Sequence, residues 1–189
     1  MNGRNLFESR GKYAFGAKKV REGPEQGVFI LHSHLDRDKA REIAGALRAS
    51  RVDYYLDEED EGPQIATEAE KHAIIVQRIE AGLEACTHLL GIITENTKSS
   101  WWVPYEIGSA TGHGRNCAHL IDAEVEQLPS YIQAATIVPD RHALQDWLPK
   151  QSGRRSLATL LELSNALARV CDYPEFIPES RSVDDLTFD

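Results

Sequence analysis

Residues 89–110 read LLGIITENTKSSWWVPYEIGSA, and the rest of the predicted architecture follows from this segment. Its first five residues form a continuous apolar run, which is typical of a strand buried on both faces of a parallel sheet. A polar turn rich in Ser and Thr follows, and the pattern after it predicts a helix. The segment is therefore expected to be a strand-to-helix junction.

A candidate site is defined by three residues that follow this turn. Pro104 is expected to be the first helical residue, because its missing N–H is one that the helix leaves unpaired there anyway. Glu106 then falls in the first turn, where the helix dipole favours an ionised carboxylate. Trp102 lies four residues earlier, so its indole and this carboxylate are expected to face one crevice. In the alternative, Glu106 only matches the helix dipole and Trp102 only packs in the core.

The length and composition indicate a soluble protein with one domain. The chain has 189 residues, enough for one sizeable core, and no apolar run approaches the length of a membrane span. Three widely spaced cysteines argue against a disulfide framework. The formal net charge of -9 disfavours binding to nucleic acid or to an anionic membrane surface. The N-terminus lacks the apolar core of a signal peptide, so the expected location is the cytoplasm.

Composition divides the chain into three parts. Residues 1–26 are locally basic and lack periodicity, and we expect an N-terminal arm, either solvated or bound to a partner. Residues 27–171 carry the strand and helix patterns and are expected to form the domain. Residues 172–189 are acidic and contain Pro174 and Pro178, and they are predicted to be a C-terminal tail.

Strands and helices alternate along the central part. Asp36 is expected to cap the first helix, which ends near Ser50. The alternation implies an α/β protein with a flavodoxin-like, five-stranded parallel sheet and helices on both faces. The predicted strands are residues 28–31, 52–56, 87–93, 118–121 and 135–138, and the later helices are residues 67–85, 142–148 and 157–171, besides the one that begins at Pro104.

Polar residues collect where these strands end. Such sheets bind ligands outside the carboxyl ends of their strands. The candidate residues at this edge are Ser33, His34, Asp57, Ser99, Trp102, Glu106 and Asp122. A metal site is the alternative, because His32 and His34 alternate onto one side of a strand end near Asp36 and Asp57. The chain is too short for the barrel of the usual His-x-His hydrolases, so no metal is expected.

Three segments together resemble the TIR (Toll/interleukin-1 receptor) domain, especially its bacterial stand-alone form. They are VFILHSHLD at residues 28–36, VDYYLD at residues 52–57 before an acidic loop, and SSWWVPYE at residues 99–106. Each segment alone is weakly specific, but their order and spacing are more so. The resemblance covers roughly residues 27–150 and implies the TIR fold.

This resemblance implies an enzyme that cleaves NAD. In many TIR domains the glutamate of a Trp-x-x-x-Glu pattern is catalytic, and here that residue is Glu106, with Trp102 as the paired aromatic. Ser33 and His34 would line the nucleotide site, where some family members carry arginine. Asp57 and Ser99 are assigned to the same substrate site. NAD would be a substrate and not a cofactor, because the chain lacks the Gly-x-Gly-x-x-Gly fingerprint of a bound dinucleotide.

The resemblance also implies partners. A homo-oligomer through TIR–TIR contacts is expected, and the acid run at residues 57–61 corresponds to a loop that moves on assembly in the family, although a merely solvated loop fits it too. Similarity to the TIR enzyme of Thoeris antiviral systems implies a messenger derived from ADP-ribose that acts on a separate effector protein, with outright NAD depletion as the alternative. Two other functions stay open: a non-enzymatic TIR adaptor and a related nucleoside-cleaving enzyme such as a deoxyribosyltransferase.

Overall fold

The computed structural model describes Gly3, Leu6 and residues 27–56, 68–138, 141–149, 165–166, 169–170 and 187–188. Most of the predicted arm at residues 1–26 lies outside this part, as do the acid loop at residues 57–61, most of the predicted helix at residues 157–171 and most of the predicted tail. Asp57 is therefore also outside the described residues.

The centre of the structure is a five-stranded sheet in which every neighbouring pair of strands is parallel. The strand order is β2-β1-β3-β4-β6, which confirms the predicted flavodoxin-like α/β fold. The strands are β1 Gly27–Leu31, β2 Asp53–Tyr55, β3 His88–Ile93, β4 Asn116–Ile121 and β6 Thr136–Ile137. A separate pair joins β5 Gln127–Leu128 to β7 Thr187–Phe188, so the end of the predicted tail pairs with the domain.

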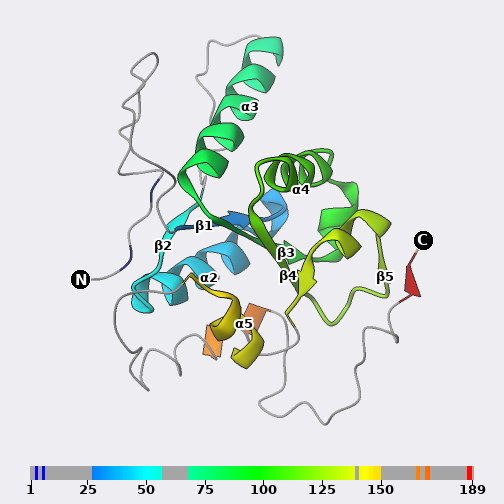
Figure 1. The fold of residues 1–189 in the computed structure, drawn as a ribbon. Coiled ribbons are helices and arrows are strands. Elements are labelled where there is room, and N and C mark those ends of the chain that lie inside the picture. Colours follow the sequence, from blue (N-terminus) through cyan, green and yellow to red (C-terminus); the bar gives the residue numbers. More distant parts are fainter. Residues whose placement is uncertain are drawn as a thin grey trace.

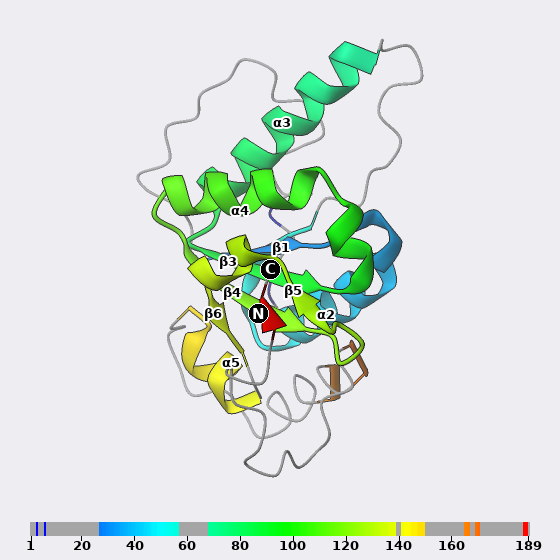
Figure 2. The same cartoon turned by 90° about the vertical axis from the view of Figure 1, so that its right-hand side faces the viewer.

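Helices cover both faces of this sheet (Figure 1, Figure 2). On one face lie α2 Arg37–Ala49 and α5 Arg141–Trp147, and on the other lie α3 Glu68–Ala85 and α4 Trp102–Gly112. The described residues also form three short 3-10 helices: η1 His34–Asp36, η2 Glu95–Ser99 and η3 Ser130–Ala134. Helices α2 and α3 lie where the apolar spacing predicted them.

The central strands β1, β3 and β4 are buried on both faces because their side chains alternate between two apolar cores. In β3, Leu90 and Ile92 point into the core beneath α2 and α5, whereas Leu89 and Ile93 point into the core beneath α3 and α4. This is the packing expected of a continuous apolar run. Because the strands are parallel, their carboxyl ends lie at one edge of the sheet, and the polar residues that follow the strands meet there.

Helix α3 packs closely on the sheet because residue 82 is a glycine. A Cβ at Gly82 would lie 2.6 Å from Phe29 and 2.7 Å from Tyr55. These two rings stack with centroids 5.3 Å apart, and the Tyr55 hydroxyl donates a hydrogen bond to the backbone oxygen of Arg78. The crossing of α3 over β1 and β2 therefore depends on the missing side chain at residue 82.

Candidate active site

Helix α4 begins two residues earlier than predicted. It starts at Trp102, so Pro104 is its third residue and Glu106 its fifth, and the prediction that Glu106 lies in the first turn is wrong. The reason is local, because Trp101 already has a right-handed helical conformation directly after η2. Pro104 still breaks no hydrogen bond, since the N–H groups of the first turn have no partner within a helix. The dipole therefore contributes less to the charge of Glu106 than expected.

Glu106 lies at the boundary between the apolar core and solvent. The buried face of α4 consists of Val103, Ile107 and Ala110, and Glu106 is half-buried beside it. The Oε2 atom of its carboxylate is shielded from solvent. A carboxylate that is held in a site poor in water interacts more strongly with a nearby positive charge than one in bulk water.

Trp102 lies one helical turn before Glu106, so the two side chains share a face of α4. The indole is half-buried and packs against the core beneath α3 and α4. Its ring centroid is 6.1 Å from that of His72 on α3 and 6.2 Å from that of Tyr105. Part of the ring is thus held by protein contacts, and the rest remains accessible.

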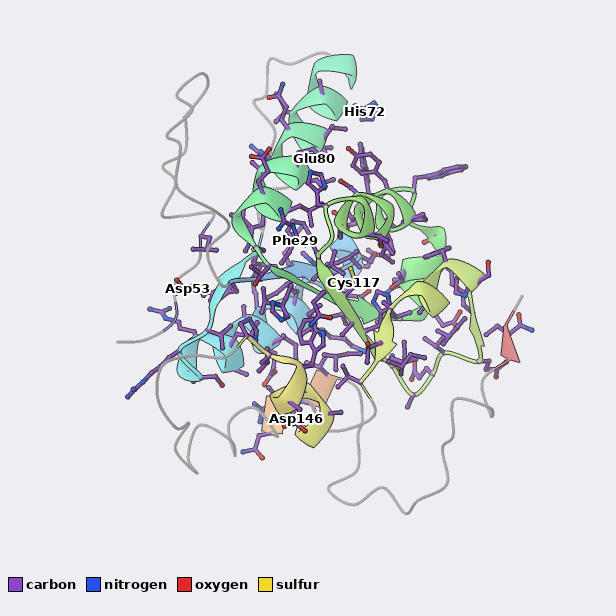
Figure 3. The ribbon with its side chains drawn as sticks, in the orientation of Figure 1. Phe29, Asp53, His72, Glu80, Cys117 and Asp146 are labelled. Carbon is purple, nitrogen blue, oxygen red and sulfur yellow. The ribbon has the colours of Figure 1, made fainter. Side chains whose placement is uncertain are left out.

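The outer side of α4 is tied to α3 by Glu80 (Figure 3). Its Oε1 accepts hydrogen bonds from Ser109 at 2.7 Å and from Tyr105 at 2.8 Å, and His113 Nε2 lies 3.5 Å from Oε2. The hydrogen bond from Ser109 is the main cause of a lowered pKa of Glu80, and the bond to Glu80 raises the pKa of Tyr105. These contacts fix the spacing between the two helices beside Trp102.

The loop after β1 contains the predicted residues Ser33 and His34. Ser33 is 3% exposed, and its hydroxyl oxygen accepts a hydrogen bond from the backbone N–H of Leu35 at 3.4 Å, which begins η1. His34 is exposed. The Ser33 hydroxyl therefore has a structural contact, whereas the imidazole of His34 faces solvent.

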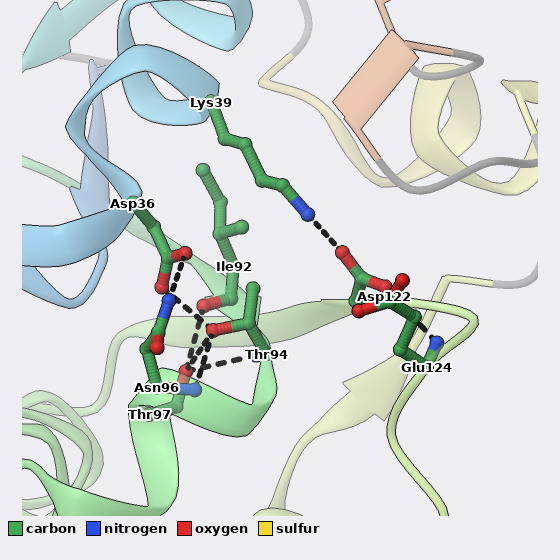
Figure 4. A network of polar contacts seen from close by, with 8 residues as sticks. All are labelled: Asp36, Lys39, Ile92, Thr94, Asn96, Thr97, Asp122 and Glu124. Atoms are coloured by element: carbon green, nitrogen blue, oxygen red, sulfur yellow. Dashed lines mark hydrogen bonds and ion pairs between the residues drawn. The ribbon is translucent and has the colours of Figure 1, made fainter.

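The prediction that Asp36 caps α2 is wrong. The residue occupies the N-cap position, but its carboxylate makes no capping hydrogen bond, because η1 runs directly into the helix and leaves Asp36 outside the extended conformation of a typical cap. The carboxylate instead accepts hydrogen bonds from Thr94 Oγ1 at 2.6 Å and from Asn96 Nδ2 at 2.8 Å (Figure 4). The sequence did not predict this contact or the roles of Thr94 and Asn96. The capping pattern of Thr94 and Thr97 was the available signal that the turn after β3 is held in a fixed conformation.

A second link joins the same edge of the sheet. Lys39 of α2 forms an ion pair with Asp122, the residue that follows β4 (Figure 4). Asp122 is 8% exposed, and its Oδ1 also accepts a hydrogen bond from the backbone N–H of Glu124 at 3.0 Å. Asp122 was predicted at this edge, and the structure places it there. Lys39 was not predicted.

The remaining predicted residue of the β3–α4 junction is Ser99. It is exposed at the end of η2, and its hydroxyl donates a hydrogen bond to the backbone oxygen of Asn96 at 2.9 Å. The structure therefore groups Ser99, Trp102 and Glu106 along one continuous junction and joins that junction to the loop of Ser33 and His34 through Asp36.

Among the residues that the structure describes, no three or more His, Cys, Asp and Glu side chains form a group suited to a metal ion. The carboxylate of Asp36, which the alternative metal site would use, accepts hydrogen bonds from Thr94 and Asn96. In the described part of the chain, every helix is too short or too polar to span a membrane.

A family model described as "TIR domain" matches residues 28–144 of the chain, which is more than half of its length. The matched range begins in β1 and ends in α5, so it contains the five-stranded sheet except for Gly27, together with every described candidate residue. No curated protein matches the sequence.

Proposed function

The chain belongs to the TIR domain family, and on this premise we propose that it cleaves the bond between ribose and nicotinamide in NAD, with Glu106 as the catalytic residue. One observation carries the proposal. Glu106 presents a half-buried carboxylate, with one oxygen shielded from solvent, one helical turn after the aromatic ring of Trp102. The arrangement offers a negative charge and a flat apolar surface side by side.

The bond-breaking step requires these two groups. When the bond to nicotinamide breaks, positive charge of oxocarbenium type develops on the ribose. Nicotinamide leaves as a neutral molecule, because the bonding electrons cancel its own positive charge, and no general acid is needed. A fixed carboxylate stabilises the developing charge and orients a ribose hydroxyl, which is the role that we assign to Glu106. The ribose carbon then bonds to water, to another atom of the same nucleotide in a cyclic product, or to a separate acceptor in a conjugate, and the proton of the attacking group passes to solvent.

The other candidate residues would hold the substrate. Trp102 would stack on a ring of NAD through the part of its indole that the protein leaves accessible. His34 and Ser99 are both exposed at the same edge of the sheet, and together with Ser33 and Asp57 they would line the nucleotide site. NAD is a substrate in this proposal, and the enzyme needs no cofactor.

In the biological role that we propose, the product is a signalling nucleotide derived from ADP-ribose, cyclic or conjugated, which a separate effector protein reads during antiviral defence in the cytoplasm. Support comes from the similarity of residues 28–36, 52–57 and 99–106 to bacterial stand-alone TIR domains, the form to which the TIR enzymes of Thoeris systems belong. Assembly through TIR–TIR contacts would complete the site. If triggered cells lost nearly all NAD without any partner protein, and only linear ADP-ribose accumulated, depletion would replace the messenger role.

The direct test is incubation of the purified protein with NAD, with and without a crowding agent, followed by chromatography of nicotinamide and the nucleotide products. Glu106→Gln is expected to abolish release of nicotinamide while circular dichroism shows an intact fold. The matched control is Glu84→Gln, which changes an exposed glutamate on α3 and should retain full turnover. Turnover by a folded Glu106→Gln protein would contradict the assignment. A wild-type protein that releases no nicotinamide in either condition would favour a TIR scaffold.

A further inference from the structure

The strand order changes direction between β1 and β3. Along the sheet, β1 is followed in sequence by β2 on one side, whereas β3 is followed by β4 on the other. In flavodoxin-like sheets the two loops at this position separate, and ligands bind in the crevice outside the carboxyl ends of the strands. Here the two loops are the one after β1, which contains Asp36, and the one after β3, which contains Thr94 and Asn96.

These loops are joined by the side chain of Asp36. One carboxylate oxygen accepts the hydroxyl hydrogen of Thr94 at 2.6 Å, and the other accepts the side-chain amide of Asn96 at 2.8 Å (Figure 4). Asp36 is 5% exposed and Thr94 4% exposed. Both oxygens are thus engaged and shielded, and a substrate hydroxyl has no open path to them. Hydrogen bonds to a charged acceptor are the strong ones, so this link resists separation of the loops.

The link extends to the start of the helix that bears Glu106. Thr94 caps η2: its Oγ1 accepts the backbone N–H of Asn96 at 3.1 Å, and its own N–H donates to Thr97 Oγ1 at 2.8 Å. The Thr97 hydroxyl in turn donates to the backbone oxygen of Ile92 in β3 at 3.3 Å. Only Ser100 and Trp101 separate η2 from α4. The place where α4 begins therefore depends on the contacts of Thr94.

We infer that Asp36 is a positioning residue for the site: by holding Thr94 and Asn96, it keeps Trp102 and Glu106 at a fixed place relative to the loop of Ser33 and His34. Asp36 itself contacts no substrate. This inference rests on the proposed function for its kinetic readout and on the fold alone for its structural readout. Misplacement of a catalytic group by about 1 Å lowers the rate by on the order of a hundredfold. We therefore expect loss of the Asp36 contacts to lower kcat.

The test exchanges the two partners. Asp36→Asn replaces a charged acceptor with an amide whose NH2 group faces that of Asn96, and Asn96→Asp places two carboxylates together, so each single variant loses the charge-assisted hydrogen bond between residues 36 and 96. In the double variant Asp36→Asn/Asn96→Asp, the amide at residue 36 donates to the carboxylate at residue 96, and its oxygen accepts from Thr94. The donor and acceptor exchange places, and the charge of the pair is unchanged.

The single variants are expected to lower kcat for NAD at least about tenfold and to change KM less than about threefold, because they move the reacting groups and remove no substrate contact. The double variant is expected to recover kcat to within about threefold of the wild type. The control is Asp38→Asn, an exposed neighbour whose partner is Arg41, which should leave both constants unchanged. All assays are run well below the melting temperature, so that unfolding contributes nothing.

Three results would overturn the inference: wild-type kcat in the folded single variants, a change confined to KM, or no recovery in the double variant. If Asp36→Asn does not fold, Asn96→Ala, which removes one of the two bonds, is judged by the same criteria. Hydrogen exchange supplies the second readout. Asp36→Asn should speed exchange of the backbone N–H of Thr97 and Ser100 at least about tenfold and leave Leu90 of β3 unchanged. Should the wild type fail to cleave NAD, the proposed function falls, and unchanged exchange at Thr97 and Ser100 would separately overturn the role of Asp36.

Discussion

The imidazole of His119 on β4 lies directly against Gly91 on β3, with its Nδ1 2.4 Å from the position that a Cβ at residue 91 would occupy. His119 is 0% exposed, and among the described residues neither ring nitrogen has a hydrogen-bond partner. Burial lowers the pKa of His119 from 6.5 to about 4. The ring therefore occupies the centre of the sheet as a neutral group.

The first prediction concerns acid stability. Because the folded pKa of His119 lies below its unfolded value, the neutral ring stabilises the fold above about pH 6.5, and this contribution is lost as the pH falls toward about 4. The loss is about 2 kcal/mol of unfolding free energy near pH 5. Urea unfolding of the wild type and of His119→Leu, each near pH 7.5 and pH 5, measures it. An equal loss in both proteins would contradict the role of His119.

The second prediction tests the fit between the two residues. Gly91→Ala is expected to destabilise the protein by about 1–3 kcal/mol, because the added methyl group meets the imidazole in a packed core. In a His119→Ala background the same change should cost less, since the ring that causes the clash is gone. Thermal or urea unfolding of the four proteins of this cycle gives the coupling. Additive changes in the free energy of unfolding would show that the added methyl group clashes with a residue other than His119.

The third prediction separates the two adjacent tryptophans. Trp102→Ala is expected to raise KM for NAD about tenfold through loss of a stacking surface, and Trp102→Phe should raise it less. Trp102→Ala also loses contacts with His72 and Tyr105, so its stability is measured in parallel. Trp101→Ala is the matched control, because that side chain is 93% exposed and should change neither stability nor KM. The reverse result, with KM raised only in Trp101→Ala, would refute the assignment.

The fourth prediction concerns assembly. If contacts between TIR domains complete the site, specific activity toward NAD should rise with protein concentration, because the active species is an oligomer. Turnover is measured over a wide dilution series, with sedimentation or light scattering at the same concentrations. Constant specific activity across the series would show that a single chain carries the complete site.

The α/β architecture was predictable because its signals are local. The apolar run at residues 89–93 predicted a strand buried on both faces, and the structure places β3 at the centre of the sheet. The helix after Asp36 and the one that ends at Ala85 followed from the same apolar spacing. Each of these patterns reflects which face of a short segment is buried, and neighbouring residues alone record that.

The sequence by itself determined the order of strands and helices and the junction that carries Trp102 and Glu106. Only the tertiary structure decided where α4 begins and what Asp36 binds. A cap and a long-range acceptor look the same in sequence, because both are an aspartate before a helix. Asp36 acts as a long-range acceptor because Thr94 and Asn96 donate hydrogen bonds to it. They lie 58 and 60 residues further along the chain and reach Asp36 only because β1 and β3 are neighbours in the folded sheet.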